Sequence, residues 1–174
     1  MDDIHALEAS VIRILVDSYC CSDKSIRELD LSGFPCVKEL KIGGFAFMYV
    51  NELKLDGLKE LESVEIGKNS FTHCKGGNDN DPNRHFYLKN CPKIRSLKIG
   101  RFSFLDYSVC MIENVPSLEV IELGDVSRDS ANFAEASLEL RSCFILNPIS
   151  GRYAVSQDCG HWACNNACAK TCCI

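Results

Sequence analysis

Apolar residues recur along this chain in short alternating stretches that repeat with a period of 24 residues. Three copies read FPCVKELKIGGFAF, LKELESVEIGKNSF and CPKIRSLKIGRFSF, and they begin at Phe34, Leu58 and Cys91. A fourth copy, VPSLEVIELG, begins at Val115 and lacks the Phe ending. A fixed period of this size is typical of a solenoid, in which each coil of the chain stacks on the next.

The copies share a glycine, which falls at Gly43, Gly67, Gly100 and Gly124, so the intervals are 24, 33 and 24 residues. The long interval contains nine extra residues, 76–84, whose sequence GGNDNDPNR is typical of an exposed loop. We therefore predict a loop inserted between coils at 76–84. A glycine at the end of a strand suits a turn that needs positive φ or close approach of another backbone.

Each coil contains two stretches that alternate like β-strands, with apolar residues facing one core and the residues between them facing out. The first stretch is Leu40-Lys41-Ile42 and its equivalents at 64–66, 97–99 and 121–123. The second stretch is centred on one apolar residue per coil, namely Leu31, Leu55, Leu88, Ile112 and Leu140. This pattern predicts a mostly β fold, a solenoid of stacked parallel strands with two short strands in each coil of about 24 residues.

The outward residues of these stretches form two tracks whose charges alternate from coil to coil. The first track is Lys41, Glu65, Lys98 and Glu122. The second track is Asp56, Lys89, Glu113 and Arg141. Stacked strands lie about 4.8 Å apart, so opposite charges on neighbouring coils stabilise the stack and like charges destabilise it. The alternation indicates that the coils stack in register, and it favours a structural role for these eight residues over a binding role.

Phenylalanine also recurs at the coil period, at Phe47, Phe71 and Phe104, with Phe45 and Phe102 nearby. We interpret this stripe as core, with one ring stacked on the next along the solenoid, rather than as a cofactor site.

The phrase IGKNSFTHC, from Ile66 to Cys74, resembles the BspA-like type of leucine-rich repeat. Residues 88–100 and 112–124 look like the same unit, and phrases such as NFAEASLELRS resemble large leucine-rich-repeat families of protists. The resemblance covers roughly residues 11–142. It implies a parallel-stranded solenoid and protein–protein interaction, and it implies neither an enzyme activity nor a cofactor.

Composition narrows the function classes further. The chain has 174 residues, a net charge of −5 and a pI near 5.4, which argues against a nucleic-acid partner because phosphate binding needs a basic surface. There is no run of 18 apolar residues, so we expect no transmembrane segment. The acidic start, Met-Asp-Asp, is unlike a secretory signal. The expected location is intracellular, in the cytoplasm.

Three regions follow from these patterns: an N-terminal cap at 1–16, the solenoid at 17–142 and a Cys-rich tail at 143–174. In the cap we predict a short helix over 2–9 and a strand at 11–16, which would cover the open end of the stack. Six of the twelve cysteines lie in residues 1–142 and are interpreted as free thiols that fill the core. Among these, Cys36 and Cys91 fall next to or at apolar repeat positions.

The other six cysteines crowd into the tail, where a zinc site is one hypothesis. Its ligands would be Cys159, His161, Cys164 and Cys168, a Cys₃His set that lacks the usual paired CxxC spacing. Disulfides are disfavoured in a reducing compartment, and a helical or disordered segment with free thiols is the remaining interpretation.

Calcium and catalysis are both disfavoured by the motifs. Asp79, Asp81 and Asn83 have the spacing of the first ligands of an EF-hand, but Arg84 and Asn90 stand where that loop needs Gly and Glu. No GxSxG, P-loop or HExxH motif is present, and we predict that the chain is not an enzyme.

The leading hypothesis is a non-enzymatic protein-binding module that presents one sheet face, the 76–84 loop, or both to a protein partner. The predicted patch is the uncharged part of the outward tracks, namely Ser63, Tyr87, Ser96, Met111 and Val120. The first alternative is a metal- or redox-responsive protein that acts through the Cys-rich tail. A second is a structural fragment of a larger array. We expect a monomer, or a weak homodimer formed at an open end of the stack.

Overall fold

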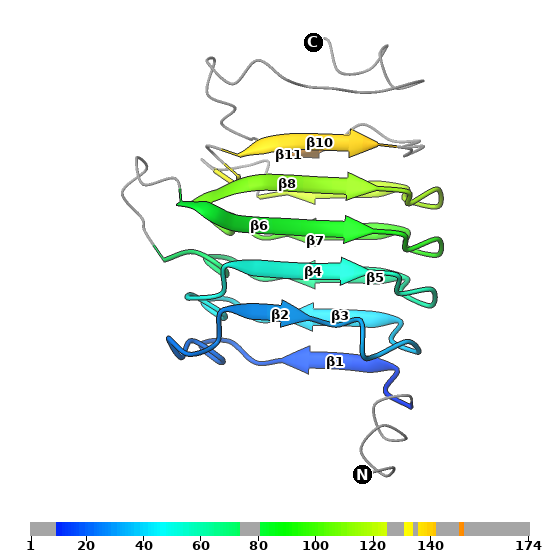
Figure 1. The fold of residues 1–174 in the computed structure, drawn as a ribbon, viewed down its shortest axis with the longest axis horizontal. Helices are drawn as coiled ribbons and strands as arrows, with labels where there is room; N and C mark the ends of the chain where they lie inside the picture. Colours follow the sequence, from blue (N-terminus) through cyan, green and yellow to red (C-terminus); the bar gives the residue numbers. More distant parts are fainter. Residues whose placement is uncertain (1–9, 74–80, 125–130, 134–135, 142–149, 152–174) are drawn as a thin grey trace.

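The structure is a computed structural model. It describes residues 10–73, 81–124, 131–133, 136–141 and 150–151. Within these residues all regular structure is β-strand, and the strands form two parallel sheets (Figure 1).

Sheet A is the six-stranded sheet and contains the odd-numbered strands. In order across the sheet these are β1 (Arg13–Val16), β3 (Glu39–Ile42), β5 (Ser63–Ile66), β7 (Ser96–Ile99), β9 (Val120–Leu123) and β11 (Ser150–Gly151). Sheet B is the five-stranded sheet and contains the even-numbered strands. These are β2 (Glu28–Asp30), β4 (Glu52–Asp56), β6 (Asp81–Lys89), β8 (Tyr107–Glu113) and β10 (Ser137–Arg141).

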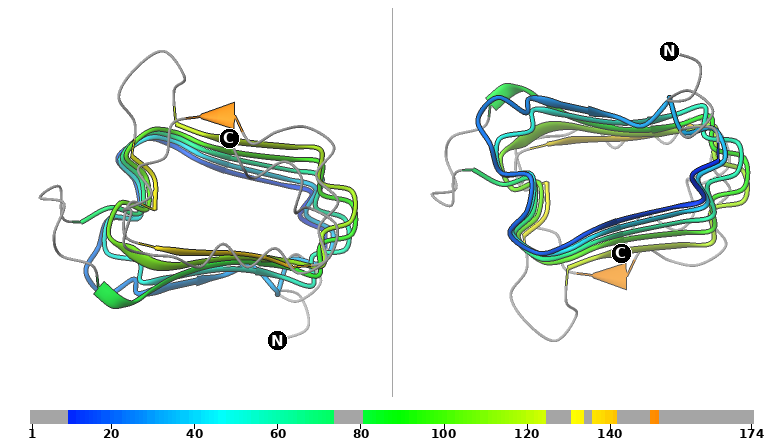
Figure 2. Two further views of the ribbon diagram at one scale, coloured as in Figure 1. Left: turned by 90° about the horizontal axis from the view of Figure 1, so that it is seen from above. Right: turned by 90° about the horizontal axis from the view of Figure 1, so that it is seen from below.

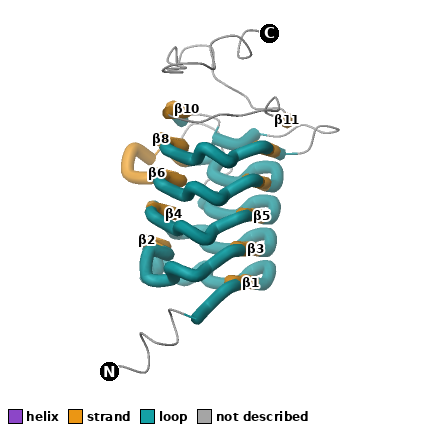
Figure 3. The backbone as a smooth tube through the Cα atoms, turned by 90° about the vertical axis from the view of Figure 1, so that its right-hand side faces the viewer, coloured by secondary structure: helices purple, strands orange, loops and turns teal. Residues whose placement is uncertain are grey.

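Successive strands of the chain alternate between the two sheets, so each coil contributes one strand to each sheet. Seen from above, the coils superimpose as a flattened ring whose two long sides are the sheets (Figure 2). From the side, the coils are stacked at even spacing (Figure 3). The predicted fold class, a solenoid of stacked parallel strands with two strands per coil, is confirmed.

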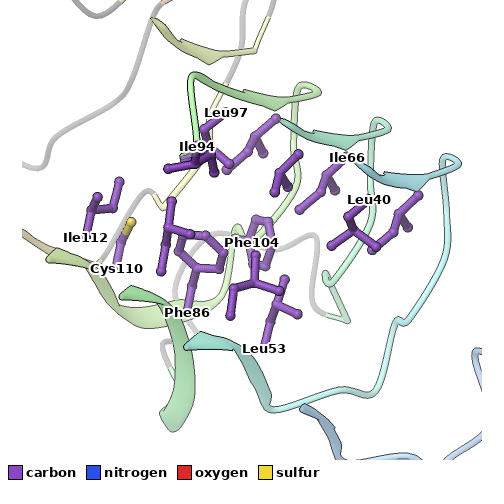
Figure 4. Packing of buried hydrophobic residues seen from close by; sticks show 14 of the residues in the cluster. Leu40, Leu53, Ile66, Phe86, Ile94, Leu97, Phe104, Cys110 and Ile112 are labelled. Carbon is purple, nitrogen blue, oxygen red and sulfur yellow. The ribbon is translucent and has the colours of Figure 1, made fainter. Parts of the chain in front are cut away.

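The core lies between the sheets, because the apolar residues of both point inward. Leu40, Ile66 and Leu97 extend from sheet A toward Leu53 and Phe86 of sheet B (Figure 4). All five are at most 2% exposed. The alternation of buried and exposed residues along each short strand is thus the physical reason why the sequence pattern located the strands.

The phenylalanine stripe is a stack of rings along the solenoid. Ring centroids are 5.2 Å apart for Phe47 and Phe71, 4.7 Å for Phe71 and Phe104, and 4.9 Å for Phe104 and Phe133. Phe133 corrects the prediction that the fourth copy has lost its Phe. In that copy the Phe follows Gly124 by nine residues instead of four, so a search at fixed spacing misses it.

The shared glycines serve close backbone approach rather than positive φ in three of the four copies. A Cβ on Gly43 would lie 2.4 Å from the backbone nitrogen of Ser18, and one on Gly67 or Gly100 would lie 2.5 Å from a backbone nitrogen of the preceding coil. Gly124 is the copy with positive φ, at 74°. In the turns that follow the other three glycines, the residues with positive φ include the phenylalanines, for example Phe71 with a φ of 55°.

Side-chain hydrogen bonds join these turns of neighbouring coils. Ser70 Oγ donates to the Gly43 carbonyl at 2.8 Å, and Ser103 Oγ donates to the Gly67 carbonyl at 2.7 Å. Asn132 Nδ2 donates to the Gly100 carbonyl at 2.8 Å. In three copies the polar residue before the Phe therefore donates to a carbonyl of the preceding coil and helps to fix the distance between coils, whereas Ala46 before Phe47 has no side-chain donor.

The boundaries of the predicted regions differ in detail from the structure. β1 pairs in parallel with β3, so residues 13–16 form the first strand of sheet A. Residues 81–84, which we predicted as part of the inserted loop, belong to β6, and the β6–β8 register shifts between Asp81 and His85. The predicted helix at 2–9 lies outside the described residues, as does the tail from 143 onward except for 150–151.

Candidate binding faces

The two sheets give the solenoid two outward faces on opposite sides of the core. On sheet A, one outward row runs Arg13, Glu39, Ser63, Ser96 and Val120, and the next runs Leu15, Lys41, Glu65, Lys98 and Glu122. On sheet B, one outward row runs Glu28, Glu52, His85, Val109 and Ser137, and the next runs Asp30, Lys54, Tyr87, Met111 and Glu139. A third row on sheet B runs Asp56, Lys89, Glu113 and Arg141.

The predicted patch is divided between these faces. Ser63, Ser96 and Val120 are register neighbours on sheet A, whereas Tyr87 and Met111 are register neighbours on sheet B. The core separates the two groups, so they do not form one surface. The sequence pattern identifies which residues face outward but does not say that the two tracks lie on opposite sides.

The face of sheet A is balanced in charge along its strands. Lys41 Nζ lies 3.0 Å from Glu65 Oε2, and Lys98 Nζ lies 3.3 Å from Glu122 Oε2, as the alternating track predicts. The other row begins with Arg13, Glu39 and Ser63. Arg13 Nε lies 2.7 Å from Glu39 Oε2. The charges of this face are therefore paired with one another, and its exposed apolar residue, Leu15, lies at the edge strand β1.

The centre of the sheet B face is aromatic and apolar. The Tyr87 hydroxyl lies 3.2 Å from His85 Nδ1, and His85 Nε2 lies 2.8 Å from the Pro82 carbonyl. A carbonyl can only accept, so Nε2 carries a proton, and in the neutral imidazole Nδ1 accepts from the tyrosine. Lys89 Nζ lies 4.7 Å from the Tyr87 ring centroid, and Met111 is the register neighbour of Tyr87 on β8. These contacts hold the Tyr87 ring in one orientation on the surface.

Acidic residues and two lysines, Lys54 and Lys89, flank this centre. Partial burial, followed by the charges of Glu52 and Glu139, raises the pKa of Tyr87 above its usual value. Glu28 and Glu52 are register neighbours on β2 and β4. Lys54, on the adjacent row, lies 3.3 Å from Asp30. The hydrogen bond to Asp30 is the main cause that raises the pKa of Lys54.

A buried ion pair lies near the start of β6 and was not predicted from the sequence. Arg84 Nη1 lies 2.7 Å from Asp106 Oδ2, and the two side chains are 3% and 6% exposed. Arg84 Nη2 donates to the carbonyls of Val50 and Phe71, and the guanidinium lies 4.8 Å from the centroid of the Tyr107 ring. These partners come from other coils and turns of the chain, so the cluster anchors the start of β6.

The cysteines in the described residues are free thiols. Cys91 and Cys110 are buried, as interpreted, and burial raises the pKa of Cys91 to about 11. Such a thiol stays protonated and is a poor nucleophile. Cys21 and Cys36 are exposed, so the interpretation of core-filling thiols is wrong for these two.

The metal sites considered from the sequence concern residues both inside and outside the described structure. No group of three or more His, Cys, Asp or Glu residues that could hold a metal ion is found among the described residues. The zinc hypothesis concerns Cys159, His161, Cys164 and Cys168, which all lie outside them. Asp81, from the calcium-like spacing, accepts hydrogen bonds from the backbone and side-chain nitrogens of Asn83 at 2.9 and 3.1 Å.

An apolar gap between the sheets is lined by residues of β7 to β10 and by Phe133. Its lining contains no polar group that could orient a ligand, so we interpret it as packing space. Among the described residues, no helix long and apolar enough to cross a membrane is found. In comparisons with known proteins, no family model, no curated protein and no solved structure matches the chain.

Proposed function

We propose that this chain is a non-enzymatic protein-binding module of the leucine-rich-repeat kind, and that it contacts its partner through the outward face of sheet B. The observation that carries the proposal is the half-buried cluster of Tyr87, Met111 and Val109 on adjacent strands β6 and β8. These side chains face away from the core, so folding does not require them to be apolar. Aromatic residues and methionine are enriched where proteins bind one another.

The opposite face supports the choice by contrast. Its central residues Ser63 and Ser96 are small, and the charged residues beside them pair across the coils. An intracellular setting is part of the proposal, because free thiols persist in reducing compartments and the described cysteines are all free. Monomer or weak homodimer remains the expected state.

The test is affinity capture with mass spectrometry from a lysate of the source organism, using three full-length proteins. These are the unchanged chain, Tyr87→Ala/Met111→Ala on sheet B, and Ser63→Arg/Ser96→Glu on sheet A. The sheet A variant adds bulk without changing the net charge. We expect the sheet B variant to lose more than about tenfold of the captured partner, as truncated aromatic anchors do, and the sheet A variant to retain it.

The changed side chains point outward, so both variants should unfold at nearly the same denaturant concentration as the unchanged chain. Unchanged capture by Tyr87→Ala/Met111→Ala contradicts the proposal. Loss of capture only by Ser63→Arg/Ser96→Glu moves the binding site to sheet A.

A further inference from the structure

Charged residues on neighbouring coils are matched almost everywhere in the described structure. Ion pairs join adjacent coils at Arg13–Glu39, Lys38–Glu62, Lys41–Glu65, Lys54–Asp30, Lys89–Glu113, Lys93–Glu60, Arg95–Glu119 and Lys98–Glu122. Opposite charges in neighbouring strands stabilise a stack, and like charges weaken it. The sequence therefore places opposite charges in register on both sheets and in the turns.

Glu28 and Glu52 depart from this rule. The two residues are register neighbours on β2 and β4, so their carboxylates occupy adjacent positions of one outward row. Within the described structure, neither side chain forms an ion pair or a hydrogen bond, since the nearby Lys54 is paired with Asp30. Like charges in adjacent positions repel each other. Lys54 attracts both carboxylates but is itself paired with Asp30, so the rule of one opposite charge per neighbouring position does not account for Glu28 and Glu52.

These carboxylates are continuous with the aromatic centre of sheet B. The row that holds them continues with His85, whose ring nitrogen is hydrogen bonded to the Tyr87 hydroxyl. Neighbouring strands lie about 4.8 Å apart, so one extended segment crossing β2, β4 and β6 can reach Glu28, Glu52 and Tyr87 together. Figure 1 shows these strands side by side.

The face as a whole has an excess of negative charge. The three outward rows of sheet B carry six carboxylates and three cations. The carboxylates are Glu28, Asp30, Glu52, Asp56, Glu113 and Glu139, and the cations are Lys54, Lys89 and Arg141. The outward positions of β1 to β9 on sheet A carry three of each sign.

We infer that the outward face of sheet B binds a basic segment of a partner protein. This inference rests on the proposed function and adds the chemistry of the partner. Lysine or arginine side chains of that segment would supply the counter-charge for Glu28 and Glu52, and an apolar residue beside them would pack on Tyr87 and Met111. Charge complementarity of this kind gives specificity and speeds association.

A defined probe tests the chemistry without the natural partner. The probe is a short fluorescent peptide of alternating arginine and leucine, titrated into the full-length chain at low salt and followed by anisotropy. A peptide of alternating glutamate and leucine serves as the control. We expect the basic peptide to bind and the acidic peptide not to bind.

Two double variants with the same charge change locate the binding. Glu28→Gln/Glu52→Gln removes two charges from sheet B, and Glu65→Gln/Glu122→Gln removes two from sheet A. We expect the first to weaken binding of the basic peptide about tenfold and the second to change it less than twofold. Thermal unfolding of Glu28→Gln/Glu52→Gln should occur at the same temperature or higher, which separates lost binding from lost folding.

Equal weakening by both double variants overturns the inference, because it would assign the attraction to net charge. Preference for the acidic peptide, or binding that survives Glu28→Gln/Glu52→Gln, also overturns it. The proposed function is judged by a different result, the capture of the natural partner by Tyr87→Ala/Met111→Ala. This variant can abolish capture while Glu28→Gln/Glu52→Gln leaves the basic peptide bound. In that case the module binds protein through sheet B, but its partner segment is not basic.

Discussion

At the scale of single residues, the glycine that ends each sheet A strand allows neighbouring coils to approach. An ideal Cβ on Gly67 would lie 2.5 Å from the backbone nitrogen of Gly44. That contact is shorter than van der Waals distance, and its partner is backbone rather than a side chain that could rotate away. The stack must therefore open locally to accept any other residue.

We predict that Gly67→Ala destabilises the protein by about 1–3 kcal/mol, the usual cost of overpacking. Gly33 is the matched control, because a Cβ there would meet nothing within 4 Å and the residue is exposed. Gly33→Ala should change stability by less than about 0.5 kcal/mol. Urea unfolding followed by circular dichroism measures both. Equal midpoints for the two variants would show that the coils can separate at this corner without cost.

Arg84 shows what residue patterns cannot reveal. Its neighbours in the sequence, Asn83 and His85, are polar, and the stretch is typical of an exposed loop. The structure instead buries Arg84 against Asp106 and the carbonyls of Val50 and Phe71, which come from three other positions in the chain. A buried charge is recognised by its partners, and partners this distant in sequence leave no local signal.

At the scale of the elements, outward charges determine how firmly neighbouring strands associate. Lys98 lies between Glu65 and Glu122 in the register of sheet A, and its Nζ is 3.3 Å from Glu122 Oε2. All three side chains are partly exposed, so solvent screens their interactions. Small contributions of one sign still accumulate along a stack of several coils.

Lys98→Glu places three carboxylates in register and should lower stability by about 1 kcal/mol. Lys59→Glu makes the same change of charge at an exposed turn position outside both tracks and should have a smaller effect. The difference between the two variants should largely disappear at high salt, because screening shortens the range of the repulsion. Thermal unfolding at low and high salt measures this. A difference that persists at high salt would indicate lost packing instead of lost charge pairing.

The elements were predictable from the sequence because their cause is local. Alternating apolar residues such as Leu40 and Ile42 determine the strand, and the fixed period determines the stacking. The proposed binding patch was only half predictable. Tyr87 and Ser63 both alternate outward, but their placement on opposite faces depends on how each coil turns between its two strands. The pattern did not identify Phe133 as part of the phenylalanine stripe, because five extra residues separate it from Gly124.

At the scale of the whole molecule, stability should vary along the solenoid. Inner coils have a neighbour on each side, and their inward residues are nearly inaccessible, for example 0% exposure at Leu53 and 2% at Ile66. The first coil has a neighbour on one side within the described structure. Its inward residues Ile14 and Leu29 are only partly buried, and Leu15 beside them is 61% exposed. In a repeat structure, stability is approximately the sum of contributions from each coil and from its contacts with its neighbours.

We therefore predict that the solenoid opens from its N-terminal end before it unfolds as a whole. Hydrogen exchange followed by mass spectrometry should show amides of β1 and β2 exchanging faster than those of β4 and β5 under native conditions. Low concentrations of denaturant should widen the difference, because opening the terminal coil exposes less surface than global unfolding. The amides of sheet A in β3 are the internal control, since they pair with β1 on one side and with β5 on the other. Uniform exchange across all these strands would mean that the coils unfold together and that contacts between coils outweigh the stability of any single coil.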